Sequence, residues 1–349
     1  MNPGRLVFCL SLLLAAAAPA QTITATLLGT AGPSLSMTEA EAGLLIQAGP
    51  EVLLFDCGHL IPERLAQLGI YNVTKVFLSH VHSDHVEGLP ILWMNELMWE
   101  GRGNSPLQVF GPPQDPPNQP SGTVDITYNL TSGFATNTHI RRDLVEHLPA
   151  GGIEFQTIEI KPGTVYQNNG VTVTAFLVHH DPVMPAYGYR VDYAGHSVVF
   201  SGDTTEPSGL VQAAKGADVL IHEVLINPPA AVPATDVILS YHTTPEQAAA
   251  VFTQVNPKLA VYTHIVAQIP GGASNLISRT QAAGYTGPLL VGTDLTSITI
   301  GDTVTVNPCN AITPPVTAAV AVSGHQPPTI NGTVTPPGGN VGRGCLGRP

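Results

Sequence analysis

The sequence predicts an α/β fold in which two β-sheets pack face to face and helices cover their outer surfaces. Short apolar runs, typical of strands, recur along the chain, and single stretches with helical spacing interrupt them. The 35 glycines and 32 prolines mark frequent turns between these runs. Only 11% of residues are charged, so the chain is loop-rich and globular, and its 349 residues suffice for a sizeable core.

The first half of the chain leads through short elements to a histidine-rich loop. A helix is predicted at residues 62–68, and strands are predicted at residues 22–28, 43–48, 51–55 and 75–79. The last of these strands ends directly before His80. Between residues 93 and 170 the pattern loosens, and only a helix near residues 139–147 is predicted there.

Regular strand signals return in the second half of the chain. They lie at residues 171–178, 187–193, 197–200, 219–221, 259–263, 289–291 and 297–305. Between two of these strands, Thr244, Pro245 and Gln247 predict a helix that begins with a capping threonine, a proline and a capping-box glutamine.

Both ends of the chain differ from its middle. Residues 1–20 are typical of a secretory signal, with Arg5 before an apolar run and a small-x-small pattern that ends at Ala20. We expect cleavage after Ala20, a secreted or periplasmic protein, and no membrane span in the mature chain; a membrane anchor is disfavoured because the run is short. Residues 21–307 are predicted to form one folded domain.

Residues 308–349 are predicted to form a Pro/Gly-rich tail without apolar periodicity. An oxidising compartment makes a disulfide between Cys309 and Cys345 plausible. Cys57 follows an apolar run, so we expect a small buried thiol rather than a reactive one.

The charge balance bears on possible partners. The formal net charge is −12 and the pI is about 5.4, and no cluster of Lys or Arg reverses this field locally. Because such a surface repels polyanions, we expect no nucleic-acid partner and a small-molecule ester substrate instead. A homodimer is compatible with the sequence.

Three imidazoles and one carboxylate follow the strand at residues 75–79 within six positions: His80, His82, Asp84 and His85. Alternate residues of a tight loop project in the same direction, so His80 and His82 can converge on one ion while Asp84 and His85 turn toward a second. Imidazole nitrogens and carboxylate oxygens are the ligands that zinc accepts in catalytic sites. A chance His-rich surface loop is the alternative, but four such groups behind a buried strand would be costly without a metal.

Three more ligand candidates follow later apolar strands: His180, Asp203 and His264. Loops at strand ends can gather ligands from distant parts of the sequence. The combined set suits two ions, with Asp203 bridging them, His80, His82 and His180 on one ion, and Asp84, His85 and His264 on the other. Each later residue taken alone could equally be a satisfied polar group, and His179 competes with His180.

A second polar pair has the spacing for proton transfer. Glu223 ends another predicted strand, and His242 lies just before the capped helix. If His242 contacts Glu223, its protonated form is favoured and it can donate a proton to a leaving group; a histidine that merely caps a loop is the alternative. Two adjacent cations activate a bound water, so we predict hydrolysis by a metal-bridging hydroxide, with two Zn²⁺ ions (Mn²⁺ or Fe being alternatives) and with His242, Glu223 and Asp84 as catalytic side chains.

These residues resemble the metallo-β-lactamase superfamily, in the branch that contains ribonuclease Z and the arylsulfatase-like hydrolases. The resemblance covers residues 22 to about 305 and is carried by the turn at 28–33, by Phe55-Asp56-Cys57-Gly58, by the segment 79–85, by Ser201-Gly202-Asp203-Thr204 and by Thr263-His264. In the family's third motif the ligand histidine precedes a Gly-Tyr-Arg strand, here Gly188-Tyr189-Arg190, which favours His180 over His179.

The resemblance implies a four-layer αββα sandwich, a dinuclear zinc centre, an Asp56 that orients the metal loop, and a Glu223–His242 pair that assists protonation of the leaving group. Ribonuclease Z carries a basic, glycine-rich arm that grips transfer RNA, whereas the residues after Pro113 are Pro-rich and acidic here. We therefore expect a secreted dinuclear-zinc hydrolase of a small phosphodiester or sulfate ester. The alternatives are a lactone or β-lactam hydrolase and a non-catalytic metal-binding interaction protein.

Overall fold

The structure is a computed structural model that describes residues 21–33, 36–98, 102–116, 119–205, 207–225, 240–266 and 272–308. The predicted signal at residues 1–20 and the predicted tail from residue 309 onward, with Cys309 and Cys345, lie outside the described residues. Cys57 is buried, as predicted. Within the described ranges, no helix has both the length and the apolar character needed to cross a membrane.

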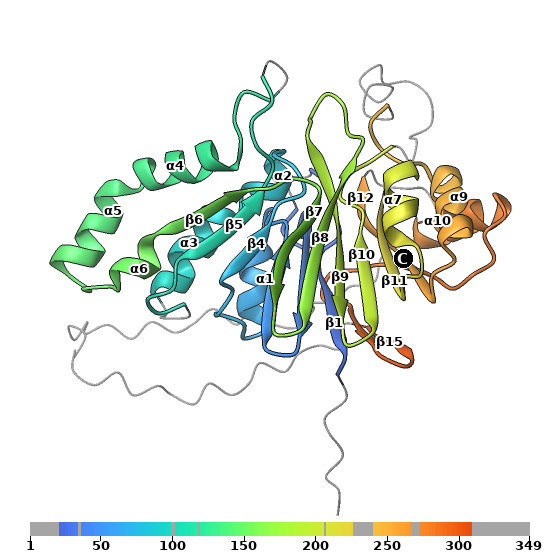
Figure 1. Cartoon of the computed structure of the whole chain (residues 1–349), viewed down its shortest axis with the longest axis horizontal. Coiled ribbons are helices and arrows are strands. Elements are labelled where there is room, and N and C mark those ends of the chain that lie inside the picture. The colour runs from blue at the N-terminus through green and yellow to red at the C-terminus, as the bar shows by residue number, and fades with distance from the viewer. Residues whose placement is uncertain are drawn as a thin grey trace, which may run out of the picture.

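Two mixed sheets form the centre of the molecule (Figure 1). The first has the order β15-β14-β1-β2-β3-β4-β5-β6, with strands β1 (Ile23–Gly29), β2 (Gly43–Ala48), β3 (Glu51–Phe55), β4 (Lys75–Phe77), β5 (Leu107–Gly111), β6 (Phe155–Glu159), β14 (Ser297–Ile300) and β15 (Val304–Asn307). The second has the order β13-β12-β11-β10-β9-β8-β7, with strands β7 (Gly163–Asn168), β8 (Val171–Val178), β9 (Ala186–Tyr193), β10 (His196–Phe200), β11 (Val219–Leu225), β12 (Leu259–Val266) and β13 (Leu289–Val291).

Helices lie on the outer face of each sheet. In Figure 1, α7, α9 and α10 lie to the right of the sheets and α3 to α6 lie to the left. The first sheet's helices are α1 (Ile61–Gln67), α2 (Ser83–Val86), α3 (Leu89–Met98), α4 (Thr123–Gly133), α5 (Ala135–His139), the π-helix η1 (Ile140–Leu144) and α6 (Ala150–Ile153). The second sheet's helices are α7 (Pro207–Ala214), α9 (Pro245–Val255) and α10 (Gly272–Ala282).

Alternating side chains divide the apolar core into three layers. On β2, Leu44 and Ile46 join the cluster between the two sheets, whereas Leu45 joins the cluster under α1 and α3. On β11, Ile221 faces the other sheet and Leu220 faces the helices on the far side. Because successive strand residues point to opposite faces, each central strand is buried on both sides. The predicted αββα sandwich is therefore confirmed.

The structure differs from the sequence prediction mainly between residues 93 and 170. The predicted helix near residues 139–147 ends at Leu144, and α4, which begins at Thr123, precedes it. Strands β5, β6 and β7 were not predicted; β6 and β7 lie at sheet edges and are only partly buried, so they lack a clear apolar pattern. The single strand predicted at residues 297–305 is the hairpin of β14 and β15.

Candidate metal centre

The parallel strands in the middle of both sheets bring the candidate ligands together. In the first sheet β3, β4 and β5 run parallel, and in the second sheet β10, β11 and β12 do. The carboxyl ends of parallel strands share one edge of a sheet, which is where loops assemble binding sites. His80 follows β4, His180 follows β8 and Asp203 follows β10, so both sheets contribute side chains to one place.

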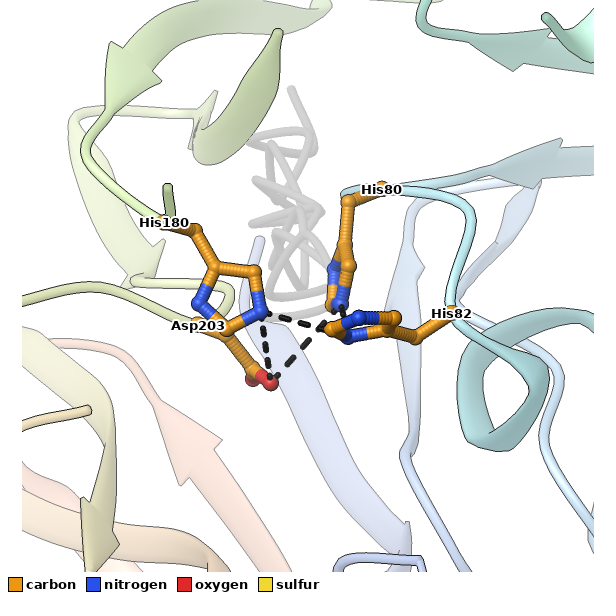
Figure 2. A group of neighbouring side chains, drawn as sticks. All are labelled: His80, His82, His180 and Asp203. Carbon is orange, nitrogen blue, oxygen red and sulfur yellow. Dashed lines mark hydrogen bonds and ion pairs between the residues drawn. The ribbon is translucent and has the colours of Figure 1, made fainter. Parts of the chain in front are cut away.

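One group of ligand candidates consists of His80, His82, His180 and Asp203 (Figure 2). The Nδ1 atom of His82 lies 2.9 Å from Nε2 of His80 and 3.3 Å from Nε2 of His180. Oδ2 of Asp203 lies 3.8 Å from Nε2 of His80 and 3.9 Å from Nε2 of His180. Four potential ligand atoms therefore face one point.

A second group consists of Asp84, His85 and His264, next to the first. Nε2 of His264 lies 3.1 Å from Oδ2 of Asp84 and 3.3 Å from Nε2 of His85. Oδ2 of Asp203 lies 3.4 Å from Nε2 of both His85 and His264. The Asp203 carboxylate thus lies within 4 Å of histidines of both sets. The structure brings together all seven side chains that the sequence analysis selected.

The sequence analysis placed His264 after the end of its strand. In the structure it lies inside β12. Glu223 pairs with Thr263 and Val224 pairs with Ile265, so His264 is an extra residue in the register with β11. Its φ of 44° is in the left-handed region that non-glycine residues rarely adopt. This bulge redirects the imidazole toward the site, and bulges commonly re-aim side chains next to functional sites. Likewise, Glu223 lies within β11, which continues to Leu225.

Hydrogen bonds to the far side of three rings fix how they are oriented. The Asp56 carboxylate accepts bonds from the Ser79 N–H and hydroxyl, each at 2.7 Å, and lies 2.8 Å from Nδ1 of His85. Nδ1 of His180 donates to the Tyr241 carbonyl at 2.8 Å, and Nδ1 of His80 lies 3.0 Å from the Ser79 hydroxyl. A partner on Nδ1 leaves Nε2 of each ring directed at the cluster, as metal-binding histidines require.

Close backbone packing holds the short helix α2, which carries Asp84. A Cβ atom added to Gly58 would lie 2.1 Å from the Asp84 carbonyl oxygen, so any larger residue would displace the loop. The Cys57 N–H donates to the His85 carbonyl, and the Gly88 N–H donates to the Cys57 carbonyl, each at 2.8 Å. The segment after β3 and the histidine-rich loop therefore form one rigid unit.

The electrostatics of the cluster fit divalent cations. Burial lowers the pKa of His80 and lowers that of His180 to about 4, so both rings are neutral and present lone pairs. Burial alone would raise the pKa of Asp203, but the neighbouring His264 and His85 hold it well below its ordinary value. The carboxylates in turn outweigh the burial of His85 and raise its pKa. A buried field that favours positive charge, next to the neutral imidazoles of His80 and His180, is the environment that a metal ion satisfies.

Glu223 and His242 lie beside the cluster. Oε2 of Glu223 is 3.2 Å from Nδ1 of His242, and Oε1 accepts bonds from the Thr243 N–H at 2.9 Å and the Thr204 N–H at 3.3 Å. Burial lowers the pKa of His242, but attraction to Glu223 and then to Asp203 outweighs this effect and raises the pKa to about 9. The imidazole is therefore a cation at neutral pH and can donate a proton.

The structure distinguishes His179 from His180 and adds backbone groups to the site. His179 is 46% exposed and pairs with Asp181 at 3.2 Å, outside the cluster, whereas His180 is fully buried within it. Sequence reasoning did not find the Tyr241 carbonyl or the Thr204 and Thr243 amides that orient the site. These are backbone groups, which do not depend on the type of side chain, so the amino-acid sequence does not reveal which of them orient the site.

Comparisons with known proteins place the chain in a family. Residues 44–265 match the model of the beta-lactamase superfamily domain. A ribonuclease Z of Mycobacterium avium is 31% identical over 288 residues, which is 78% of this chain and 96% of that protein. A ribonuclease Z of Mycobacterium bovis is 30% identical over 280 residues, covering 77% of this chain and 95% of that protein.

Solved structures show the same fold. The metallo-beta-lactamase fold protein YhfI of Bacillus subtilis superposes with a TM-score of 0.61 at 19% identity, covering 80% of this chain and 99% of YhfI. The short form of human tRNase Z superposes with a TM-score of 0.57 at 21% identity, covering 79% of this chain and 98% of that protein. The chain belongs to the beta-lactamase superfamily, with ribonuclease Z homologues, and it is a metal-dependent hydrolase of the metallo-β-lactamase fold.

The comparisons overturn one expectation from the sequence. The net charge of −12 led us to exclude nucleic acid as a partner. Two relatives at 30% and 31% identity over most of the chain are ribonucleases by name, so that exclusion is wrong. The physical reason is that net charge averages over the whole surface, whereas an ionised substrate responds to the field of the site that it enters.

Proposed function

We propose that the chain hydrolyses phosphodiester bonds at a centre of two metal ions, zinc being the leading candidate. The observation that supports this proposal is that seven candidate ligand side chains converge next to a protonated His242. His80, His82 and His180 would hold one ion, Asp84, His85 and His264 would hold the other, and Asp203 would bridge them. Bound divalent ions would lower the pKa of a water nucleophile and stabilise negative charge on the reacting centre.

The protein's own groups divide the remaining work. Asp56, Ser79 and the Tyr241 carbonyl orient the ligand histidines, so little reorganisation is needed during the reaction. His242 donates a proton to the leaving oxygen, and Glu223, held by two backbone amides, keeps that imidazole charged and in place. A proton donor assists the departure of an alkoxide, which is the leaving group when an alkyl phosphodiester is cleaved.

We propose two candidate substrates, an RNA phosphodiester and a small phosphodiester. The name of the ribonuclease Z relatives supports an RNA phosphodiester, whereas the Pro-rich, acidic residues after Pro113 support a small diester, which needs no basic arm. Aryl sulfate is the further ester that suits the same ions and the same acid. We also propose export with cleavage after Ala20, supported by the pattern of residues 1–20 and tested by N-terminal sequencing of exported protein.

Turnover by metal-loaded protein tests the proposal. The protein is loaded with zinc or manganese and assayed against bis(p-nitrophenyl) phosphate, a transfer RNA precursor, p-nitrophenyl sulfate, a homoserine lactone and nitrocefin. We expect metal-dependent cleavage of a phosphodiester that Asp203→Asn reduces by about 100-fold or more, whereas the exposed His179→Ala retains it. Activity restricted to the lactone and nitrocefin would refute phosphodiester hydrolysis.

A second assay isolates the role of His242. His242→Ala should slow diesters with poor alkyl leaving groups by about 100-fold and activated nitrophenyl diesters far less, because only poor leaving groups need a proton. Equal losses on both substrates would remove His242 from the role of acid.

A further inference from the structure

Residues 30–33, which follow β1 and which we call the β1 loop, pack against the candidate ligand His264. The Ile265 N–H, next to His264 in β12, donates to the Thr30 carbonyl at 2.7 Å. A Cβ atom added to Gly32 would lie 3.3 Å from Cε1 and 3.6 Å from Nε2 of the His264 ring. The β1 loop therefore contacts both the backbone of the bulge and the imidazole that the bulge redirects.

His264 depends on such contacts more than the other candidate ligand rings do. Nδ1 is within hydrogen-bonding distance of a partner in His80, His85 and His180. Nδ1 of His264 is buried and has no hydrogen-bond partner among the described residues. The φ of His264, 44°, belongs to a conformation that persists only where surrounding contacts enforce it. Its ring is therefore oriented by packing and by the backbone of its neighbours, which the β1 loop contacts.

Asp294, between β13 and β14, holds the β1 loop. Its Oδ1 accepts bonds from the Thr30 N–H at 3.0 Å and from the Thr30 hydroxyl at 2.9 Å. Its Oδ2 accepts bonds from the Ala40 N–H at 2.8 Å and from the Arg64 guanidinium at 2.9 Å. The Ala40 carbonyl in turn accepts the Ala31 N–H at 3.0 Å. Four donors from three segments thus converge on one largely buried carboxylate.

The bonds of Thr30 connect Asp294 to the candidate metal centre. The N–H and hydroxyl of Thr30 both donate to Asp294, and its carbonyl accepts from Ile265. A displacement of Thr30 would therefore reach the bulge through one hydrogen bond and the His264 ring through Gly32, two residues further on. None of the four bonds to Asp294 comes from a candidate ligand, so any effect on the centre is indirect.

We propose that Asp294 is a positioning residue for His264 and acts through Thr30 and the β1 loop. Its part in metal binding rests on the proposed two-ion centre, whereas its effect on the His264 ring exists without a metal. Groups that orient a metal ligand from outside the coordination sphere change metal affinity by about 10- to 100-fold when they are replaced.

Nuclear magnetic resonance of the histidine ring nitrogens in the full, metal-free chain tests the positioning. Asp294→Ala removes every acceptor of the carboxylate, so we expect the His264 ring resonances to shift. The His180 resonances should stay, because the Tyr241 carbonyl holds that ring.

The matched control is Asp218→Ala, which also removes a buried carboxylate with several partners. Asp218 accepts the Ser197 N–H at 2.7 Å and pairs with Lys258 at 2.7 Å. It directly precedes β11, at the end of that strand opposite Glu223. This variant should lose stability without shifting the His264 resonances.

Zinc binding in competition with a chelator gives the second measurement. In Asp294→Ala we expect the ion at Asp84, His85 and His264 to bind about 10-fold or more weakly, with the affinity of the other ion changed by less than about 2-fold. A parent chain that binds no pair of ions would contradict the proposed centre, and the comparison on the metal-free chain would still decide the role of Asp294.

A milder variant, Thr30→Val, removes the hydroxyl bond to Asp294 and keeps the backbone bonds. It should shift the His264 resonances in the same direction as Asp294→Ala but less, and it decides the outcome should Asp294→Ala fail to fold. The inference is overturned if the deciding variant leaves the His264 resonances as in the parent, or if Asp218→Ala shifts them equally.

Discussion

At the scale of single residues, the chemistry of the site depends on groups that touch neither ion nor substrate. Asp56 is fully buried, has a left-handed φ of 58°, and joins Ser79 to His85 through both of its carboxylate oxygens. Such a conformation for an aspartate persists only where surrounding contacts enforce it. The orientation of His85 is thus set by Asp56, which contacts this ring and not the candidate metal.

Replacing Asp56 should therefore weaken metal binding without removing a ligand. In Asp56→Asn an amide faces Nδ1 of His85, and metal affinity should fall by about 10- to 100-fold in competition with a chelator. The control is Asp192→Asn, which changes an aspartate that pairs with Arg190 at the surface, away from the cluster. Unchanged affinity in Asp56→Asn would mean that His85 needs no such partner.

The pH dependence should report the Glu223–His242 pair. The pKa of His242 is raised to about 9, so the proton donor is present at neutral pH and is lost as the pH rises through that value. Glu223→Gln removes the attraction that favours the charged ring, so the alkaline limb of kcat for a poor leaving group should move toward neutral pH. A limb that stays at the same pH in Glu223→Gln would show that His242 is not the titrating acid.

At the scale of elements, the sequence predicted strand bounds correctly where the pattern that sets them is local. The strands β2, β3, β8 and β13 have the predicted bounds because apolar runs end at turn residues. The bulge that places His264 depends on the register between β11 and β12, and the edge strands β6 and β7 owe their existence to neighbours far along the chain. The sequence of one strand alone does not predict its pairing partner or its register.

The start of α9 is a local feature whose strength can be measured. The Thr244 hydroxyl accepts from the Gln247 N–H at 3.3 Å and Oε1 of Gln247 accepts from the Thr244 N–H at 2.8 Å. Thr244→Ala should lower the free energy of unfolding by about 1 kcal/mol in a denaturant titration, and Thr244→Ser should restore most of it. An alanine variant as stable as the parent would show that Pro245 alone fixes the helix start.

At the scale of the whole molecule, the candidate centre joins two sheets that also meet through apolar contacts and through hydrogen bonds, such as that from the Tyr166 hydroxyl to Glu51. His80 and His82 come from the turn after β4 of the first sheet, Asp84 and His85 from the short helix α2 that follows it, and His180, Asp203 and His264 come from the second sheet. The sequence indicated this set because an apolar run precedes His80, His180, Asp203 and His264, although His264 lies inside β12 and not after it. It could not indicate the substrate, since an averaged charge says little about a local site, and the exclusion of nucleic acid failed for that reason.

Metal removal should destabilise the fold, because bound ions would connect the two sheets. An ion that binds only the folded state stabilises it by about 2.7 kcal/mol at 100 times its dissociation constant, so chelation should lower Tm by several degrees. His179→Ala should lose as much Tm on chelation as the parent, and His264→Ala should lose less. Equal Tm values with and without chelator would exclude a metal link between the sheets.

The central claim, that seven side chains from both sheets hold a pair of ions, is tested most directly by anomalous diffraction from crystals of the zinc-loaded protein. The account predicts two adjacent zinc peaks, one among His80, His82 and His180 and the other among Asp84, His85 and His264, with Asp203 between them. A single peak, or peaks away from these residues, would contradict it.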